Sequence, residues 1–321
     1  MRIVLCYPVE QRHCEQIAAV AADIEVVDAG QERIAELLPT ADIFCGHAKV
    51  PVPWDEVVAQ GRLRWIQSSA AGMDHCLVPS VIASDILVTS ASGLFANQVA
   101  EQTLALLLGL LRGLPTFFRQ QQLKDFTRRP TQDLHGKTVG IIGLGGNGRR
   151  IAEILSPFRV RILATDMFPR DKPVHVEDLR PAEELHEVLS QVDVVILCVP
   201  LNRQTHHLID AAALARMKPG AILINVARGP VVDEAALVNA LESGHLSAAG
   251  LDVAEVEPLA KASLLWEMSN VIITPHVGAQ SATRVDDSTA LFCENLQHYL
   301  RGERLRNIVD KNLGFPRPSS D

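Results

Sequence analysis

The stretch Val139-Gly-Ile-Ile-Gly143-Leu-Gly145-Gly-Asn-Gly148 decides the fold. An apolar run enters a GxGxxG turn, and the segment that follows, 149–155, has helical character. In such a strand–turn–helix unit the first glycine permits a tight turn, the second lets the backbone approach a pyrophosphate, and the third lets the helix pack on the strand. The amino terminus of the helix then faces the phosphates. This stretch therefore predicts a dinucleotide-binding domain.

An acid ends the next predicted strand, where a bound dinucleotide would place its ribose. Asp166 closes the apolar run 160–165 and lies 18 positions after Gly148. A carboxylate there can accept hydrogen bonds from the adenosine ribose hydroxyls and repels a 2′-phosphate, which favours NAD over NADP. The alternative is a glycine turn without a ligand, in which Asp166 only ends a strand. Asn147 stands where an aliphatic residue usually packs the helix, so the local geometry of the turn is open.

Short apolar, β-branched runs alternate with segments of helical period along nearly the whole chain. This alternation predicts the α/β class, with parallel sheets joined by helices. The first set of predicted strands is 3–6, 24–27, 43–46, 65–67 and 87–89. The second set, six strands that fit a complete dinucleotide-type sheet, is 139–142, 160–164, 194–199, 221–226, 249–253 and 271–274. We therefore expect two doubly wound parallel-sheet domains.

Two long helical segments flank the second set of strands. The first begins near Asn97, a candidate N-cap with Glu101 in the first turn, and continues to Leu111. Because it is apolar on all sides, it must be buried between layers or between subunits. The other segment covers 282–300 and ends at Gly302, and the tail 315–321 is predicted to be disordered.

Composition and charge exclude several classes of protein. Hydrophobic residues make up 47% of the 321 residues and charged residues 21%, which is ordinary for a globular chain. The net charge of -8 repels phosphate backbones and argues against a nucleic-acid partner. The longest apolar run falls far short of the ~20 residues that span a bilayer, and the start lacks a signal-peptide pattern. The six cysteines form no CxxC pair, which favours a reducing, cytoplasmic location.

Three predicted strands of the second set end in residues that carry chemistry. Arg228 follows the first of them, Glu257 comes in the run after the next, and His276 follows the last. Because ligands bind at the carboxyl edge of parallel sheets, these side chains are candidates for one site. Each also has a structural alternative: Arg228 as a cap or ion-pair residue, Glu257 as a surface acid, and His276 as a buried, satisfied histidine. Glu255 is a competing acid in the same run.

Reduction of a 2-oxo acid explains these residue types. When a hydride reaches the carbonyl carbon, the oxygen must gain a proton, and the imidazolium of His276 can supply it. A carboxylate such as that of Glu257 stabilises the charged imidazole. The planar fork of Arg228 suits a substrate carboxylate and polarises the carbonyl. The remaining histidines show no metal-ligand spacing, so no metal is predicted.

In this order the motifs resemble those of the NAD-dependent D-isomer-specific 2-hydroxyacid dehydrogenases. The resemblance runs from Gly72-Met-Asp74 through Val99-Ala-Glu101, the glycine turn and Asn225-Val-Ala-Arg228-Gly to the 252–258 run and Thr274-Pro-His276. It implies that Arg228 binds the substrate, that His276 is the acid/base and that Glu257 is its partner. It also implies that the amides of Ala71 and Gly72 hold the substrate carboxylate.

The resemblance further implies a cofactor site, a domain division and a homodimer. The expected cofactor contacts are Gly143, Gly145, Gly146, Asn147, Gly148, Arg149, Asp166, Pro200, Ala227, Asp252, His276 and Gly278, with Asp252 beside the nicotinamide carboxamide. The expected substrate domain, flavodoxin-like, is 1–97 with 285–321, and the expected Rossmann domain for NAD is 98–284, with the active site in the cleft between them. Within the Rossmann domain, residues 98–130 are expected to form the dimerisation helix and arm.

The substrate is less closely defined by the sequence. Phe95 stands where formate- and phosphoglycerate-type relatives usually carry asparagine, which argues against those two substrates. Trp266 resembles the glyoxylate and hydroxypyruvate reductase branch and either walls the substrate pocket or belongs to the core. His47 and Lys49 follow the third predicted strand, where they could meet an acidic or hydroxylated substrate tail.

We therefore expect an enzyme that moves a hydride between NADH and a small 2-oxo acid. The rival class is an NAD-sensing protein of the corepressor type, which keeps the same fold and acts by recruiting partners. A second enzymatic alternative, reduction of a different small oxo acid with NADPH, is disfavoured by Asp166.

Overall fold

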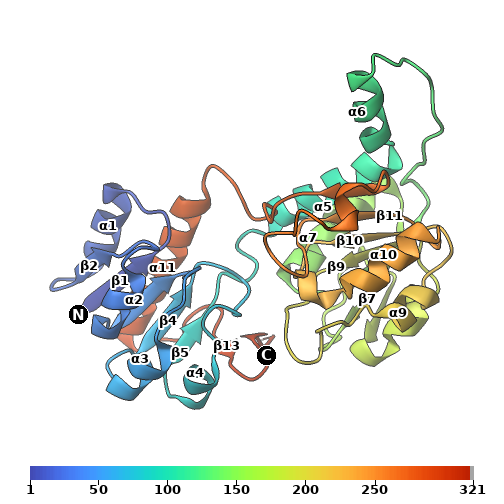
Figure 1. The fold of residues 1–321 in the computed structure, drawn as a ribbon. Coiled ribbons are helices and arrows are strands. Elements are labelled where there is room, and N and C mark those ends of the chain that lie inside the picture. The colour runs from blue at the N-terminus through green and yellow to red at the C-terminus, as the bar shows by residue number, and fades with distance from the viewer. Residues whose placement is uncertain (319–321) are drawn as a thin grey trace. The chain divides into compact units, whose positions relative to one another are not determined.

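The computed structural model describes residues 1–318, which form two compact units. Unit 1 contains residues 1–95 and the chain from 281 onward, and unit 2 contains residues 96–280. Each unit has its own parallel sheet with helices on both faces (Figure 1). The predicted α/β class with two parallel sheets is confirmed. The chain passes between the units at 95–96 and 280–281, whereas the boundaries expected from the sequence are 97–98 and 284–285.

Unit 1 is built on a five-stranded sheet of order β2-β1-β3-β4-β5, in which all neighbours are parallel. This is the doubly wound order 2-1-3-4-5. The strands are β1 (Arg2–Cys6), β2 (Glu25–Asp28), β3 (Ile43–Gly46), β4 (Trp65–Ser68) and β5 (Leu87–Thr89). The predicted strands agree with these within one residue at each end. Their apolar side chains form two clusters, one on each face of the sheet.

The helices of unit 1 come from both ends of the chain. They are α1 (Gln11–Ala18), α2 (Ile34–Leu37) with a 3-10 turn (Leu38–Thr40), α3 (Trp54–Gln60), α4 (Pro79–Ala83) and α11 (Arg284–Arg301). Helix α11 packs against α1 and ends at Gly302, whose backbone is left-handed. The predicted disorder of the tail is wrong for its first part, because β14 (Phe315–Pro316) pairs with β13 (Val309–Asp310). The rest of that prediction includes residues 319–321, which lie outside the described residues.

Unit 2 is built on a seven-stranded parallel sheet of order β12-β11-β10-β9-β6-β7-β8. The strand order reverses between β6 and β9, which makes a topological switch point. The strands are β6 (Thr138–Ile142), β7 (Arg161–Asp166), β8 (Asp178–Pro181), β9 (Val194–Leu197), β10 (Ala221–Asn225), β11 (Leu246–Leu251) and β12 (Val271–Ile273). Six of these seven strands were predicted, so the sheet has one strand more than the sequence indicated.

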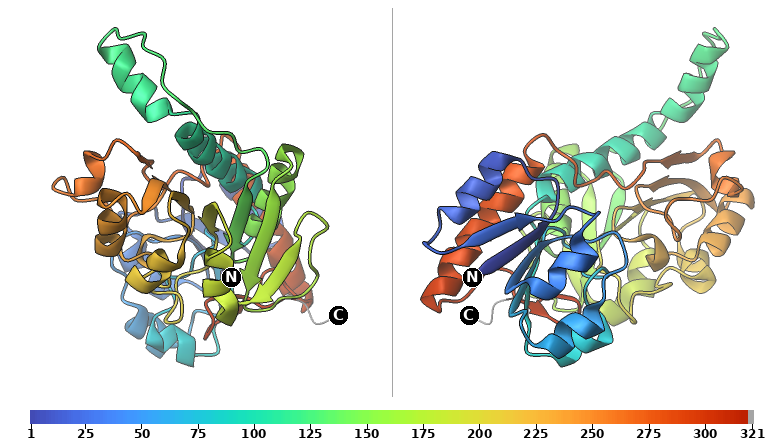
Figure 2. Two further views of the ribbon diagram at one scale, coloured as in Figure 1. Left: turned by 90° about the vertical axis from the view of Figure 1, so that its right-hand side faces the viewer. Right: turned by 60° about the vertical axis from the view of Figure 1, so that its left-hand side comes forward.

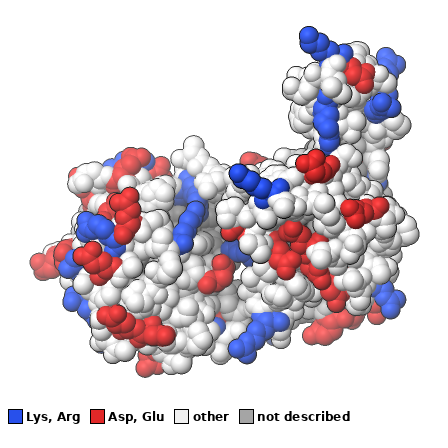
Figure 3. All heavy atoms as spheres, in the orientation of Figure 1, with Lys and Arg blue, Asp and Glu red and all other residues white. Residues whose placement is uncertain are grey.

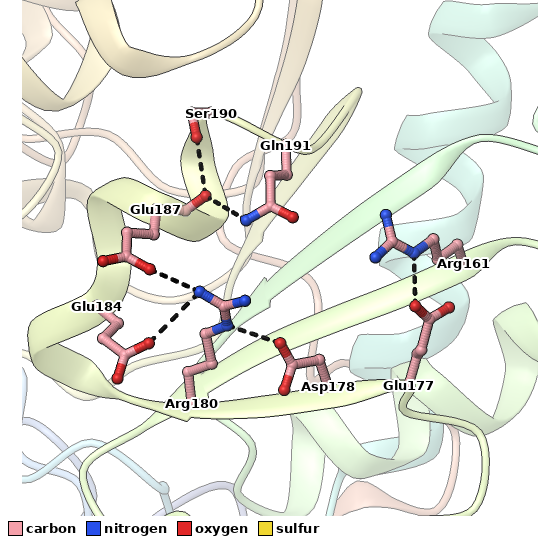
Figure 4. A network of polar contacts seen from close by, with 8 residues as sticks. All are labelled: Arg161, Glu177, Asp178, Arg180, Glu184, Glu187, Ser190 and Gln191. Atoms are coloured by element: carbon pink, nitrogen blue, oxygen red, sulfur yellow. Dashed lines mark hydrogen bonds and ion pairs between the residues drawn. The ribbon is translucent and has the colours of Figure 1, made fainter.

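The strand that the sequence analysis missed is β8, at the edge of the sheet. Its sequence Asp-Leu-Arg-Pro has one large apolar residue and no alternation. Figure 4 shows Arg180 of this strand surrounded by three carboxylates, of Asp178 at 2.6 Å, Glu187 at 2.7 Å and Glu184 at 3.4 Å. The ion pairs of Arg180 and the backbone hydrogen bonds to β7 stabilise β8. A pattern of hydrophobic residues reveals neither kind of interaction.

The remaining helices of unit 2 cover its sheet. They are α5 (Ala96–Leu111), α6 (Leu114–Gln122), α7 (Gly146–Leu155), α8 (Leu185–Leu189), α9 (Ala211–Arg216) and α10 (Glu234–Glu242), with 3-10 turns at Ser156–Phe158, Ala182–Glu184, Gly229–Val231 and Leu264–Trp266. Helix α5 packs against α7 and β11. It begins at Ala96, so Asn97 lies inside the helix rather than at its cap, and Glu101 lies beyond the first turn.

Helix α6 and the loop after it project from the body of unit 2 (Figure 2). Here we call residues 114–130 the arm. The arm exposes large apolar side chains: Leu114 at 40%, Phe118 at 60%, Leu123 at 78% and Phe126 at 101% of their surface. Soluble monomers rarely expose several such side chains together, so the arm is a candidate contact surface.

Acidic and basic side chains are interspersed over the face drawn in Figure 3. Among residues 1–318, every helix is too short or too polar to cross a lipid bilayer.

Candidate active site

The predicted site residues of unit 2 lie in loops at one edge of its sheet. All seven strands are parallel, so their carboxyl ends share an edge. Asp166 is the last residue of β7, and the loops after β6, β9, β10, β11 and β12 carry, in that order, the glycine turn, Pro200, Ala227 with Arg228, Asp252 with Glu257, and His276 with Gly278.

The glycine turn has the geometry that a dinucleotide requires. Gly143 has φ +95°, a left-handed conformation that favours glycine. A Cβ on Gly148 would lie 2.2 Å from the carbonyl oxygen of Gly143, so only glycine lets the helix approach the strand. Around Gly145 a Cβ would meet nothing within 4 Å, which leaves open space beside the start of α7. This space at a helix amino terminus fits a pyrophosphate.

Residues at the start of α7 are placed as the motif expects. Gly146, Asn147, Gly148 and Arg149 form its first turn. The guanidinium of Arg149 donates to the carbonyls of Asp171 at 2.7 Å and Arg170 at 3.1 Å. Arg149 therefore fixes the loop after β7.

Asp166 ends β7 and faces the glycine turn. Its Oδ2 accepts from the amide of Leu144 at 2.7 Å, and its Oδ1 accepts from the amide of Phe168 at 2.8 Å. Both bonds hold the carboxylate next to the turn. A carboxylate in this position can bind ribose hydroxyls through its remaining lone pairs.

His276 and Glu257 form a hydrogen-bonded pair. Nδ1 of His276 lies 2.9 Å from Oε2 of Glu257, and the side chains are 44% and 40% exposed. The other oxygen of Glu257 accepts from the amide of Ala254 at 3.3 Å. Because a carboxylate can only accept, Nδ1 carries the proton in this pair, and Nε2 is the nitrogen available to a substrate.

The charge of Glu257 is stabilised by its surroundings. Burial alone would raise the pKa of Glu257, but the hydrogen bond and charge of His276, the Ala254 amide and the charge of Arg228 outweigh it. The pKa of Glu257 is therefore lowered below its ordinary value of 4.5. Glu257 is ionised at neutral pH and favours the charged imidazole.

The competing acid, Glu255, is bound elsewhere. Its Oε1 lies 2.6 Å from Nε2 of His207, and its Oε2 accepts from the amide of Glu234, the first residue of α10, at 2.9 Å. Glu255 therefore ties three loops of the edge together, while Glu257 contacts His276. Glu255 was a candidate from the sequence, but its partner His207 was not predicted, because no motif pairs residues that are 48 positions apart.

Asp252 is a buried centre of hydrogen bonds. Its Oδ1 accepts from Thr274 Oγ1 at 2.6 Å and from the Val277 amide at 3.0 Å, and its Oδ2 accepts from the Gly278 amide at 2.8 Å. Its own carbonyl accepts from the amide of His276 at 2.7 Å. Asp252 thus holds the loop on which the histidine sits.

Arg228 lies on the loop after β10, as expected. Its Nη1 donates to the carbonyl of Ala227 at 2.7 Å, and its own carbonyl accepts from Asn225 at 3.1 Å. Gly229 follows it, and a Cβ there would lie 1.7 Å from the carbonyl oxygen of Ala254. The Arg228 loop and the Glu257 loop are therefore in direct contact.

Pro200 and Ala227 complete the edge. The carbonyl of Pro200 accepts from Thr205 Oγ1 at 2.6 Å, and the amide of Ala227 donates to Asn225 Oδ1 at 3.0 Å. Trp266 lies on the 3-10 turn that precedes β12, with 52% of its surface exposed, and its indole donates to the carbonyl of Ala260 at 3.0 Å. The structure thus gives Trp266 a partner on its own loop.

The other predicted substrate residues belong to unit 1. Ala71 and Gly72 lie on the loop after β4, and His47 and Lys49 on the loop after β3. The ring of His47 stacks on that of His75, with centroids 4.0 Å apart. Residues 1–318 contain no group of three or more His, Cys, Asp or Glu side chains arranged to hold a metal ion.

Comparison with known proteins identifies relatives of this chain. The sequence model "D-isomer specific 2-hydroxyacid dehydrogenase, NAD binding domain" matches residues 104–278. A glyoxylate reductase of Pyrococcus horikoshii is 36% identical over 263 residues, which cover 78% of each chain. A D-3-phosphoglycerate dehydrogenase of Mycobacterium tuberculosis (strain ATCC 25618 / H37Rv) is 32% identical over 306 residues, which cover 93% of this chain and 57% of that protein. The chain therefore spans little more than half of the latter's length.

A solved structure shows the same fold over nearly the whole chain. The D-isomer specific 2-hydroxyacid dehydrogenase of Xanthobacter autotrophicus Py2, in complex with NADPH and MES, is 30% identical with a TM-score of 0.81, and the match covers 98% of this chain and 99% of that one. Two parallel sheets, one of which carries a glycine turn that fits a dinucleotide, define a two-domain nucleotide-binding fold. The chain belongs to the D-isomer specific 2-hydroxyacid dehydrogenase family, and so is an enzyme with a nicotinamide cofactor.

Proposed function

We propose that this enzyme interconverts a small 2-oxo acid and a D-2-hydroxy acid with NADH, and that glyoxylate or hydroxypyruvate is the favoured substrate type. The observation that carries the proposal is the 2.9 Å contact between His276 Nδ1 and Glu257 Oε2 at the carboxyl edge of the sheet. Such a pair is what an acid/base histidine requires.

In the proposed reaction His276 moves the proton. The nicotinamide cofactor, when bound, supplies or accepts the hydride. The imidazolium of His276 gives its Nε2 proton to the substrate oxygen in reduction and takes it back in oxidation. Glu257 holds Nδ1, which fixes the tautomer and stabilises the imidazolium.

Binding of the substrate carboxylate is assigned to Arg228 and to the amides of Ala71 and Gly72. A guanidinium fork matches a carboxylate with two parallel hydrogen bonds. In this proposal unit 1 is the substrate domain and unit 2 the cofactor domain.

The preference for NADH over NADPH rests on Asp166. Its carboxylate lies beside the glycine turn, 2.7 Å from the Leu144 amide, and would repel a 2′-phosphate. We also propose that the cofactor is bound by the other residues predicted from the sequence: Gly143, Gly145, Gly146, Asn147, Gly148, Arg149, Pro200, Ala227, Asp252, His276 and Gly278.

The substrate assignment to glyoxylate or hydroxypyruvate rests on size and polarity. Phe95 is 5% exposed and stands where formate- and phosphoglycerate-type relatives usually carry asparagine, which argues against those two substrates. Trp266 stays in the proposal as a wall of the substrate pocket. Lys49 could meet a polar substrate tail; if Lys49→Ala leaves the relative rates across substrates unaltered, that role is dismissed.

A homodimer through residues 98–130 is part of the proposal. The occupant of the arm surface would be a second copy of the chain, which would cover Phe118, Leu123 and Phe126. A monomer by light scattering at micromolar concentration would contradict it. A cytoplasmic location is also proposed, since all six cysteines are free thiols.

The experiment measures consumption of NADH and of NADPH by the purified protein with glyoxylate, hydroxypyruvate, pyruvate and bulkier 2-oxo acids. We expect turnover with NADH, highest for the two small substrates. His276→Ala should lose about 10²- to 10⁴-fold in rate, because it removes the general acid. Tight NADH binding without turnover of any 2-oxo acid would contradict the proposal.

A further inference from the structure

Arg284 is a half-buried cation that the sequence motifs do not explain. It is the first residue of α11 in unit 1. Its guanidinium carbon lies 5.5 Å from the centroid of the Phe95 ring, and Phe95 is 5% exposed. Arg284 therefore sits over a buried aromatic side chain rather than in open solvent.

Among residues 1–318, no acid forms an ion pair with this cation. Within residues 1–318 the ring contact with Phe95 is the one interaction that we find for the guanidinium. The two acids in the same helical turn are engaged: Asp286 pairs with Arg12 at 2.7 Å and His13 at 2.8 Å, and Asp287 accepts from Thr283 at 2.9 Å. Burial accordingly lowers the pKa of Arg284.

The position of Arg284 on its helix is also unfavourable. A helix amino terminus carries a partial positive charge and favours acids, not cations. A partly buried charge without a counter-ion costs free energy as well. Both costs would be offset by a bound anion.

The surroundings of Arg284 connect it to the carboxyl edge of the unit 1 sheet. Phe95 ends the segment that follows β5. Within this segment the amide of Ala91 donates to the carbonyl of Ala70 at 3.0 Å, which ties it to the loop after β4. Ligands of parallel sheets bind at this edge.

We propose that Arg284 binds a carboxylate of the 2-oxo acid substrate and so helps to determine which acids the enzyme uses. This inference rests on the proposed function. The carboxylate has two possible sources, the one next to the reacting carbonyl or a second one at the far end of the substrate.

The test compares the single variants Arg284→Met and Arg301→Met with the wild-type enzyme. Methionine keeps apolar contact with Phe95 and removes the charge, and Arg301 is an exposed arginine on the same helix. KM is measured for glyoxylate, which has one carboxylate, and for oxaloacetate, which has two, together with KM for NADH and Tm.

We expect Arg284→Met to raise KM for a 2-oxo acid about tenfold or more, because a hydrogen bond to a charged group is lost. KM for NADH and Tm should change little, Arg301→Met should be silent, and Arg284→Lys should restore part of the affinity. A rise for both acids identifies the reacting carboxylate, and a rise for oxaloacetate alone identifies a second one. Unchanged KM for both acids, or an equal effect of Arg301→Met, would overturn the inference.

Two further measurements separate this inference from the proposed function. If Arg284→Met does not fold, KM of Arg284→Lys for glyoxylate and oxaloacetate is used instead, since lysine keeps the charge but not the fork. A raised KM for a 2-oxo acid then supports the inference, and an unchanged KM for both acids overturns it. If the wild type turns over no 2-oxo acid, the proposed function fails, and the rise of Tm with oxalate is measured instead. A rise that Arg284→Met abolishes still supports a carboxylate site at Arg284, whereas no rise in the wild type overturns it.

Discussion

The two edges of the unit 2 sheet use the same kinds of polar residue for different purposes. At the amino edge, Asp193 accepts from the Thr138 amide at 2.8 Å and from Lys218 at 3.0 Å, which joins the starts of β6, β9 and β10. At the carboxyl edge, His276 and Glu257 bind each other and leave Nε2 of the imidazole to a substrate. A polar cluster that closes on itself stabilises the sheet, and one that keeps a reactive atom open can perform chemistry.

The largest expected effect concerns two glycines of the turn. Gly145→Ala should fold with an unchanged Tm, because its Cβ meets nothing within 4 Å, yet lose about 10- to 100-fold in NADH affinity because the Cβ takes space that the pyrophosphate needs. Gly148→Ala should lower Tm as well, since its Cβ would meet the Gly143 carbonyl at 2.2 Å. Fluorescence titration and thermal unfolding check both. Equal Tm values for the two variants would contradict this distinction.

Removing the carboxylate partner of the histidine should have the next largest effect. Glu257→Gln should lower kcat about tenfold, because the amide keeps the shape but no longer stabilises the imidazolium. Steady-state kinetics measure it. Glu255→Gln is the matched control two residues away, and an equal loss of kcat there would mean that the His276 contact is not what matters.

The pH dependence of this pair follows from the lowered pKa of Glu257. A carboxylate with a lowered pKa in the folded state stabilises the fold above its ordinary value of 4.5, and this contribution is lost as the pH falls through the folded-state pKa. The Tm difference between wild type and Glu257→Gln should therefore be present just above pH 4.5 and shrink as the pH falls below it. A difference that is unchanged down to pH 3 would show that Glu257 does not act through its charge.

The smallest expected effect is at the amino edge. Asp193→Asn should lower the free energy of unfolding by about 1 kcal/mol, because a partly exposed ion pair is weakened while the amide can still accept from Thr138. Rates and NADH affinity should stay at wild-type values. Urea unfolding and kinetics together test this, and a loss of rate larger than that of Glu257→Gln would erase the contrast between the edges.

Predictions from sequence succeeded where the signal is local. The apolar runs of β1, β3, β6 and β9 and the left-handed glycine turn follow from adjacent residues, so both sheets were predicted. Strand β8 was missed because ion pairs of Arg180 with Glu184 and Glu187, which come later in the chain, stabilise it. The N-cap at Asn97 was wrong because α5 starts one residue earlier, at Ala96.

At the candidate site the same limit applies. Strand ends predicted Arg228, Glu257 and His276, and Glu257 was preferred to Glu255 because it directly precedes Pro258, as in the family pattern. The distances then show which partner each acid has. His207 and Arg284 matched no motif, because what makes each notable is a neighbour distant in the sequence: Glu255 for the first and Phe95 for the second.

The left-handed backbone of His276, with φ +54°, has a consequence for redesign of the enzyme. A non-glycine residue adopts this conformation at a cost, and here the hydrogen bonds that the amides of His276, Val277 and Gly278 donate to Asp252 compensate it. The position of the imidazole is therefore determined by the hydrogen bonds of buried Asp252 to the loop backbone, and not by contacts of the histidine side chain alone. A redesign that moves or replaces the proton donor must therefore also change Asp252 and the loop hydrogen bonds that it accepts.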